Sequence, residues 1–309
     1  MIGRLVNEQL STMKPKELWG NVLPLLHKND LTIMNLEAAL TLHPIKVPKV
    51  FNFKSDPEHV QCLKEANCEV VNIANNHIFD YAEQGLFDTL DTLDQAGIRH
   101  VGAGRTIQEA KKPVIIEIDG IRIGILGYTD NEPNWLATDQ NPGTNYFPIN
   151  SDSVDKLSHE IRELKREVDL VILSIHWGPN MVESPPKHFI DFAHQAVNAG
   201  VDIFHGHSAH IFQGVEIYKG SVILYDTGDF VDDYYVDPHL RNDRSFLFCV
   251  TVDKTAIRSI ELVPVLIENF QVNLSSGSNL RETLERMVLL SSEFDTVFQT
   301  GNDTLHIEL

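Results

Sequence analysis

Short apolar runs alternate with longer amphipathic stretches along most of this chain. Apolar runs bounded by polar or turn-forming residues are typical of buried strands. They predict strands at Leu31–Met34, Val70–Ala74, Val114–Ile118, Ile121–Leu126, Leu170–Ile175, Val201–Phe204, Val222–Tyr225, Phe246–Val252 and Ile257–Val263. Asp119-Gly120 separates the third run from the fourth and predicts a hairpin turn. The last two runs predict a second hairpin.

Three stretches between these runs carry apolar residues at helical spacing. The expected helices contain, in order, Leu86, Leu90 and Leu93, the series from Val154 to Val168, and Phe189, Phe192 and Ala196. Gly97 and Gly200 follow the first and third helices, where glycine is favoured at a helix C-terminus. Strands that alternate with helices predict an α/β fold with parallel strands, to which the hairpins add antiparallel edges.

The pattern changes near the C-terminus, where the β-type alternation fades. Asn279 and Glu282 form a capping signal for a helix that runs through Val288. We therefore expect one domain at residues 1–265 and a C-terminal helical appendage at residues 266–309.

Composition restricts the class of partner. The 25 Lys and Arg residues against 44 Asp and Glu residues give a formal net charge of −19, which disfavours nucleic acid as the main ligand. The three cysteines have no repeated spacing, which argues against a disulfide framework or a thiolate zinc site. No apolar run is long enough for a membrane span or a signal peptide. We expect a cytoplasmic protein, with an export signal preceding Met1 as the alternative, and the oligomeric state stays open.

Polar side chains follow four of the predicted strands at their carboxyl ends. They are Glu37, then Asn76 with His77, then His176, and finally His205, His207 and His210. Ligands bind beyond the carboxyl ends of parallel strands, so these side chains are expected to meet. Imidazole nitrogens with carboxylate and amide oxygens suit Zn, Mn or Fe. The sequence therefore predicts a divalent metal site that holds one or two ions.

Each of these segments also has a structural interpretation. Asn75-Asn76 alone fits a turn, because both residues tolerate left-handed backbone. A single histidine at a strand end, such as His176, is commonly a hydrogen-bonded structural residue. Packing does not readily explain three histidines within six residues around Gly206. Taken together, the four strand ends favour the metal site.

Two arginines follow an acidic loop late in the chain. Arg241 and Arg244 have the donor geometry to bind an anionic substrate in bidentate fashion. The alternative is that they pair with Asp237 or Asp243, which are close in sequence.

The motifs resemble a known family. In chain order they are Asn35-Leu36-Glu37, Ala74-Asn75-Asn76-His77 through Asp80, Gly102-Ala103-Gly104, His176-Trp177-Gly178 and Gly206-His207-Ser208-Ala209-His210. They are similar to those of CapA proteins of bacterial capsule and poly-γ-glutamate synthesis, in the calcineurin-like metallophosphatase superfamily. The resemblance covers Met1–Phe230. It implies a metallophosphatase-like α-β-β-α sandwich with mixed sheets.

The resemblance also implies roles for individual residues. The metal ligands are Glu37, Asn76, His176, His207 and His210, with His205 as a substitute for either of the last two. His77 is the acid that assists the leaving group. Asn75 and Asp80 complete the motif around His77 and are expected, with the two arginines, to contact substrate.

The sequence departs from the family pattern in two places. CapA-like chains carry a strand ending in Gly-Asp before the segment that resembles Ile2-Gly3-Arg4, so the first strand and the Asp ligand of the first metal are expected to be missing here. Either the start of the sequence is misplaced or trimmed, or the protein has lost one metal site. Gly228-Asp229-Phe230 stands where the family often has Gly-Asn-Phe, and the extra carboxylate either joins the cluster or caps a turn.

Three functions remain open on these grounds. The first is a metal-dependent hydrolase of a phosphoester or γ-glutamyl amide, which uses metal-activated water on a small-molecule or peptide-like anionic substrate. The second is a non-catalytic accessory protein of capsule or polyglutamate synthesis with a degenerate metal site. The third is a structural sandwich without metal.

Overall fold

The computed structural model describes the backbone of residues 1–309 and the side chains of residues 1–150 and 154–309. Its helices are α1 (Arg4–Leu10), α2 (Leu23–Leu26), α3 (Val60–Glu65), α4 (Ala82–Ala96), α5 (Ile107–Lys111), α6 (Ser151–Lys165), α7 (Lys187–Ala199) and α8 (Gly277–Ser292). Short 3-10 helices are η1 (Pro15–Val22), η2 (Pro57–His59) and η3 (Pro133–Trp135).

The strands of the first half are β1 (Thr32–Asn35), β2 (Ala39–Leu40), β3 (Lys54–Ser55), β4 (Cys68–Asn72), β5 (Arg99–Val101), β6 (Ala103–Gly104), β7 (Val114–Ile118), β8 (Ile121–Thr129) and β9 (Gly143–Thr144). Those of the second half are β10 (Leu170–His176), β11 (Ile203–His207), β12 (Val215–Tyr218), β13 (Ser221–Leu224), β14 (Arg244–Val252), β15 (Ile257–Glu268), β16 (Gln271–Leu274), β17 (Gln299–Gly301) and β18 (Thr304–Glu308).

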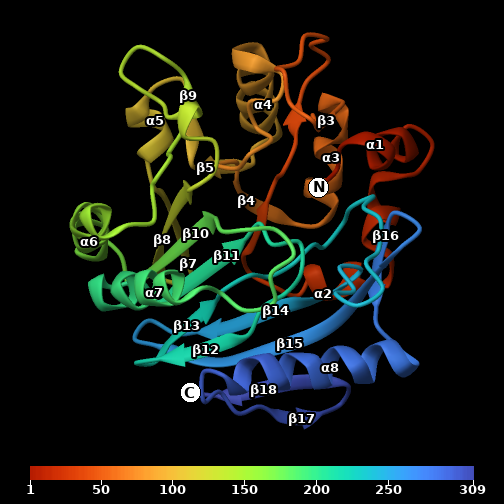
Figure 1. Cartoon of the computed structure of the whole chain (residues 1–309), viewed down its shortest axis with the longest axis vertical. Helices are drawn as coiled ribbons and strands as arrows, with labels where there is room; N and C mark the ends of the chain where they lie inside the picture. The colour runs from red at the N-terminus through yellow and green to blue at the C-terminus, as the bar shows by residue number, and fades with distance from the viewer.

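Three sheets carry the architecture (Figure 1). The first has the order β1-β4-β5 and is parallel throughout. The second has the order β12-β13-β11-β10-β8-β7, with parallel pairing from β13 to β8 and an antiparallel strand at each edge. The third is antiparallel and contains β14, β15, β16, β17 and β18. Mixed sheets and covering helices make this an α/β sandwich, as the sequence predicts.

Alternation of side chains along the strands builds the layers, because successive side chains of a strand point to opposite faces. In β4, Val71 packs into the core beneath α3 and α4, whereas Val70 packs into the core between the sheets. In β10, Val171 packs against the α6 and α7 layer, whereas Ile172 packs into the core between the sheets. Each central sheet is therefore apolar on both faces, with helices outside and the other sheets inside.

The predicted elements are largely confirmed. Each apolar run forms a strand, both hairpins are present, and the three expected helices are α4, α6 and α7. The helix expected through Val288 is α8. The expected boundary after residue 265 falls inside β15, and β16, β17 and β18 pair within the same sheet as β15. The division into two domains stays a prediction, and the tail contains strands as well as its helix.

Candidate functional site

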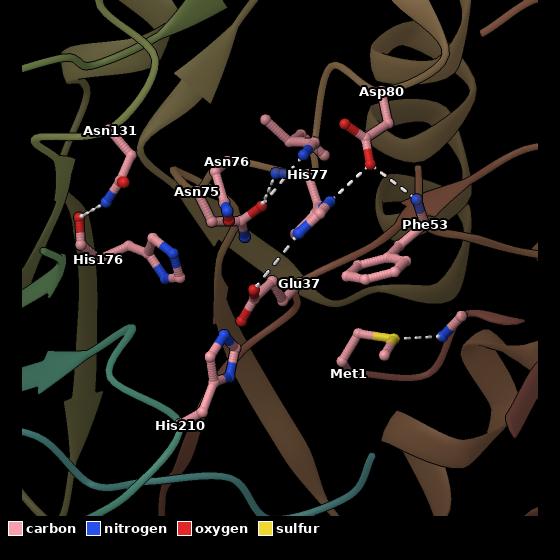
Figure 2. Close-up of polar contacts among 12 residues, drawn as sticks. Met1, Glu37, Phe53, Asn75, Asn76, His77, Asp80, Asn131, His176 and His210 are labelled. Atoms are coloured by element: carbon pink, nitrogen blue, oxygen red, sulfur yellow. Dashed lines mark hydrogen bonds and ion pairs between the residues drawn. The ribbon is translucent and has the colours of Figure 1, made fainter. Parts of the chain in front are cut away.

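The candidate site lies where the carboxyl ends of strands from two different sheets face one another. Asn35 of β1 pairs with Asn72 of β4 in the first sheet, and His176 of β10 pairs with His207 of β11 in the second. Figure 2 shows Glu37, which follows β1, between His77 and His210, with the ring of His176 pointing toward them. The sequence suggested the rim of a single parallel sheet. The structure instead brings the side chains together across a sandwich.

His77 is held by its neighbours on the first sheet. Its Nδ1 atom lies 2.6 Å from Asp80 Oδ2, and its ring centroid lies 3.9 Å from that of Phe53. Asp80 Oδ2 also accepts a 2.7 Å hydrogen bond from the Phe53 backbone N–H. The Nε2 atom of His77 is 3.8 Å from Glu37 Oε1. Asp80 therefore fixes the ring through Nδ1 and leaves Nε2 directed at the centre of the site.

His210 has a comparable carboxylate partner on the second sheet. Its Nδ1 lies 3.0 Å from Asp229 Oδ1, and its ring stands edge-on to Tyr234 at 4.8 Å. Burial opposes protonation, but the carboxylates of Asp229, Glu37 and Asp226 together outweigh it and raise the pKa of His210 to about 10. His210 also has a positive φ of 61°, and Ser208 has a φ of 136°. Strained backbone of this kind gathers at functional sites.

Among the described side chains, no carboxylate is hydrogen-bonded to His176, His205 or His207. His207 Nε2 lies 3.2 Å from Asn72 Nδ2 and 3.1 Å from Ser174 Oγ, and its Nδ1 lies 3.0 Å from His176 Nδ1. His205 Nδ1 lies 3.1 Å from Ser174 Oγ. Burial lowers the pKa of His176 and of His205 to about 4, and lowers that of His207 well below its usual value. These rings are neutral at pH 7, the form in which imidazole binds metal.

Glu37 is a buried, ionised carboxylate at the centre. Its Oε2 accepts a 3.2 Å hydrogen bond from Asn35 Nδ2, while its residue is 4% exposed. Burial raises its pKa, but the nearby His176, His210 and His77 outweigh burial, so the net effect is a lowered pKa. The carboxylate therefore keeps its negative charge although its residue is buried.

Two buried oxygens at the centre of the site, Glu37 Oε1 and Asn76 Oδ1, have no hydrogen-bond partner among the described residues. Asp80 Oδ1 has an ion-pair partner in Lys49 at 2.9 Å, and the Asp229 carboxylate shares a hydrogen bond with Asp232. An unpaired buried acceptor, above all a charged one, is costly unless a cation or donor reaches it. Among the residues with described side chains, no three His, Cys, Asp or Glu are arranged to hold a metal ion as they stand. The donor types and these unpartnered oxygens fit a divalent cation. To bind it through Nδ1, His176 and His207 would have to give up their 3.0 Å contact with each other.

Comparison with known proteins adds the family. The family model described as bacterial capsule synthesis protein PGA_cap matches residues 1–234. This chain belongs to that family. Similar proteins include the capsule biosynthesis protein CapA of Bacillus anthracis, 32% identical over 100% of this chain and 75% of the relative. The PGA biosynthesis protein CapA of Bacillus subtilis (strain 168) is 29% identical over 100% of this chain and 80% of the relative. A probable polyglutamine synthesis accessory protein of Mycobacterium tuberculosis is 31% identical over 87% and 76%, respectively.

The residues expected to bind substrate in this PGA_cap member have other contacts. Asn75 donates to Asn35 Oδ1 and the Leu36 carbonyl, and accepts from the backbone N–H groups of His77 and Ile78. It therefore shapes the turn beneath His77, in agreement with its interpretation as a turn residue.

The two arginines lie against α8. Arg241 makes two hydrogen bonds of 2.8 and 2.7 Å to the Asp243 carboxylate, which is the internal pairing that the sequence offered as an alternative. Arg244 is buried and donates to Glu282 Oε2 at 2.6 Å and Asn279 Oδ1 at 2.8 Å. Their guanidinium groups are thus engaged in holding α8. Substrate binding by either arginine stays a prediction, and none of the contacts described here supports it.

Several site residues escaped the sequence interpretation. Asn72 and Ser174 hold His207, and their only sequence signal is that each is a polar residue inside an apolar strand. Lys49 lies in the loop between β2 and β3 and contacts the Asn76–Asp80 turn, for which the sequence carries no signal. Asp229, for which the sequence left open a place in the cluster or a role in a turn, is the partner of His210.

Gly206 is required by close packing between β11 and its neighbours. A Cβ atom at this position would lie 2.0 Å from the Tyr225 carbonyl oxygen and 2.6 Å from Trp177 Nε1. Only glycine fits such an approach. The glycine between His205 and His207 therefore lets β11 pack close enough to place both rings in the site.

A cavity of about 550 Å³ opens beside the site. Glu37, His205, His207 and Asp229 line its polar part, and apolar side chains of β1, β8, β10 and β14 form its walls. A cavity of this size is typical of small-molecule sites, in which a few polar groups stand among apolar walls.

Separately, none of the helices with described residues has the length and apolar character needed to cross a membrane.

Proposed function

We propose that this CapA-like protein is a metal-dependent hydrolase that cleaves a phosphoester or a γ-glutamyl amide bond in an anionic substrate. The observation that carries the proposal is the pair of unpartnered buried oxygens, Glu37 Oε1 and Asn76 Oδ1, next to neutral histidines and a carboxylate-held His77. Relatives named for PGA and capsule biosynthesis favour an anionic, polymer-related substrate over a neutral one.

The candidate ligands come from both sheets. Glu37 and Asn76 contribute oxygens from the first sheet, and His176 and His207 contribute neutral nitrogens from the second. His205 is a further neutral nitrogen, whereas His210 is committed to Asp229 and needs to lose a proton before it can bind a cation. Donors of this mixed type suit Mn, Zn or Fe. When bound, such a cation supplies Lewis-acid activation of water and of the scissile bond.

The residues of the chain handle the proton. Hydrolysis joins the oxygen of water to phosphorus or to the carbonyl carbon and breaks the P–O or C–N bond. The leaving oxygen or nitrogen then needs a proton. His77 gives it from Nε2, because Asp80 holds Nδ1 and so leaves Nε2 directed at the centre of the site. Glu37, 3.8 Å from that nitrogen, keeps it directed at the centre.

The test uses purified protein stripped with a chelator and reloaded separately with Mn, Zn and Fe. Bound metal is measured by elemental analysis, and turnover is measured with p-nitrophenyl phosphate and a γ-glutamyl peptide. We expect His77→Asn to lower turnover by about 10²–10⁴-fold and to keep the metal. Glu37→Gln should lose both. The control is His188→Asn, an exposed histidine in α7, which should keep both.

One observation favours the accessory function as a second candidate. His176 and His207 satisfy one another through their Nδ1 atoms at 3.0 Å, which is an arrangement that needs no metal. A relative is also named as an accessory protein. Stoichiometric metal without turnover on either substrate class would favour this candidate. Absence of bound metal after loading with all three ions would rule out the hydrolase.

A further inference from the structure

Lys49 joins three segments that surround the site. Its ammonium group donates to the Asn76 backbone carbonyl, lies 2.9 Å from Asp80 Oδ1 and 3.7 Å from Glu132 Oε1, and stands 4.8 Å from the centroid of the Trp135 ring. Its own segment is the loop between β2 and β3. The Asn76–Asp80 turn follows β4, and the segment containing Glu132 and Trp135 follows β8. One side chain therefore links the first sheet to the second.

Both of the linked segments hold site residues. The turn carries Asn76 and His77, and Asp80 binds His77 through the oxygen that Lys49 does not contact. The segment after β8 contacts the backbone of His176: the Asp130 N–H donates to the His176 carbonyl at 3.2 Å, and Asn131 Nδ2 donates to it at 3.4 Å. A shift of either segment changes the separation between His77 and His176.

We propose that Lys49 is a positioning residue for the hydrolysis proposed above, and this inference rests on that function. It holds Asp80 from one side while His77 is held from the other, so that the His77 ring keeps its direction. Without the ammonium group, Asp80 Oδ1 loses its 2.9 Å ion-pair contact, and among the described contacts the Phe53 N–H alone then helps to hold the carboxylate beside His77. The Asn76 carbonyl loses its donor in the same change.

Burial separates this contact from an ordinary surface ion pair. The Asp80 side chain is 0% exposed and that of Lys49 is 20% exposed. Exposed pairs contribute little, whereas charge-assisted bonds to buried carboxylates are among the stronger contacts in proteins. Lys54, five residues later, makes the comparison within the same region. Its ammonium group donates to the His43 carbonyl and lies over the Tyr81 ring, and these contacts include none of the site residues.

The experiment compares Lys49→Met, Lys49→Arg and the control Lys54→Met. Hydrogen exchange of residues 73–80 is measured on metal-free protein, so this readout needs neither metal nor turnover. The native segment contains the His77 and Ile78 N–H groups bonded to Asn75 Oδ1. We expect Lys49→Met to speed exchange there at least about fivefold and to leave α8 unchanged, because loss of one contact opens a local segment without unfolding the protein.

Steady-state kinetics of the metal-loaded protein give the second readout. Lys49→Met should lower kcat at least about tenfold with KM changed less than about threefold, because the lost contact orients His77 and binds no substrate. Lys49→Arg should restore kcat to within about threefold, since arginine keeps the charge and the donors. Lys54→Met should match the wild type in both readouts.

Two results would overturn the inference. One is unchanged exchange in residues 73–80 of Lys49→Met. The other is a rise in KM at constant kcat, which would make Lys49 a substrate-binding residue. If the wild-type protein shows no turnover with any metal, the proposed hydrolase fails, whereas faster exchange in Lys49→Met would still establish that Lys49 holds the turn.

Discussion

The five histidines of the site form two groups that differ in their partners. His77 and His210, the carboxylate-held pair, each place Nδ1 within 3.0 Å of a buried aspartate oxygen. His176, His205 and His207, the carboxylate-free trio, contact a serine hydroxyl, an asparagine amide or one another. The two groups meet around one carboxylate, that of Glu37, which influences the pKa of His176 and whose own pKa is lowered by His176, His210 and His77.

The two kinds of partner give His210 and the carboxylate-free trio opposite pKa shifts within one pocket. A carboxylate near a ring favours the protonated form, and those of Asp229, Glu37 and Asp226 together raise the pKa of His210 to about 10 despite burial. Burial without a carboxylate favours the neutral form and lowers the pKa of His205 to about 4. The first environment suits a residue that holds or delivers a proton, and the second suits a metal ligand. All five residues are histidines, and only their neighbours in the folded chain make their environments different.

The largest expected effect comes from removing a carboxylate from the held pair. In metal-free protein, Asp229→Asn removes the carboxylate that is hydrogen-bonded to the buried His210 cation and should lower the free energy of unfolding at pH 6 by about 3–5 kcal/mol. Because the pKa of His210 is raised, the stabilisation from its pair is fully present below about pH 6.5 and is lost as the pH rises through about 10. Urea denaturation from pH 6 to 10.5 measures it.

The matched control for that prediction is Asp237→Asn. Asp237 is an aspartate of the following loop that accepts only backbone hydrogen bonds from His239 and Leu240. Any change in the free energy of unfolding caused by Asp237→Asn should therefore be the same at pH 6 and at pH 10. A cost for Asp229→Asn that is the same at every pH would remove the distinction between the two groups of histidines.

For the carboxylate-free trio, the free energy of unfolding is expected to fall as the pH decreases, which is the opposite dependence. His205 has a lowered pKa of about 4, so the unfolded chain binds its proton first as the pH falls below about 6.5, and folding loses stability until about pH 4. In metal-free protein, His205→Gln should make the loss between pH 6.5 and 4 smaller by up to about 3 kcal/mol. Urea denaturation across that range measures the slope.

A histidine outside the site gives the comparison for this slope. His188→Gln replaces an exposed ring of α7 and should leave the acid-induced loss as in the wild type. Equal slopes in His205→Gln and the wild type would mean that the buried ring does not stay neutral. The distinction between proton-holding and ligand histidines would then have no basis on the second sheet.

Much of the fold follows from the sequence because its central strands are continuous apolar runs. Strand β12 escaped notice because Glu216 interrupts its apolar pattern. Yet Glu216 is buried, with His194 Nε2 at 2.9 Å and the Tyr225 hydroxyl donating to it. β17 is exposed along its length and offers no apolar pattern at all. Such strands are specified by partners distant in sequence, which local periodicity does not report.

The site was predictable in its members and less so in its arrangement. Glu37, His77, His176 and His207 follow or end apolar strands, so strand ends alone located them. Their division between two facing sheets depends on how the sheets pack. The partners that separate the histidines, such as Asp229 and Ser174, are single polar residues whose contacts exist only in the folded chain.

The smallest expected effect tests whether Arg4 stabilises the surroundings of the carboxylate-held pair without affecting the trio. The Arg4 guanidinium group pairs with Asp233 and lies 5.1 Å from the Phe53 centroid and 5.5 Å from that of Tyr234. Phe53 packs on His77 and Tyr234 packs on His210. Arg4→Met should lower the free energy of unfolding by about 1–2 kcal/mol, through the lost charged hydrogen bonds and cation–π contacts. It should leave the acid-induced slope that reports on the trio unchanged.

Arg105→Met is the matched control, because Arg105 also combines an ion pair, with Asp91 at 2.5 Å, and an aromatic contact, with Phe87 at 4.7 Å. The difference is burial: the Asp233 side chain is 0% exposed and that of Asp91 is 57% exposed. Exposed pairs of this kind contribute about 0–1 kcal/mol. Equal losses in the two variants would show that Arg4 is an ordinary surface contact. A changed acid slope in Arg4→Met would show that both groups of histidines depend on it, and the two halves of the site would then have to be treated as one unit.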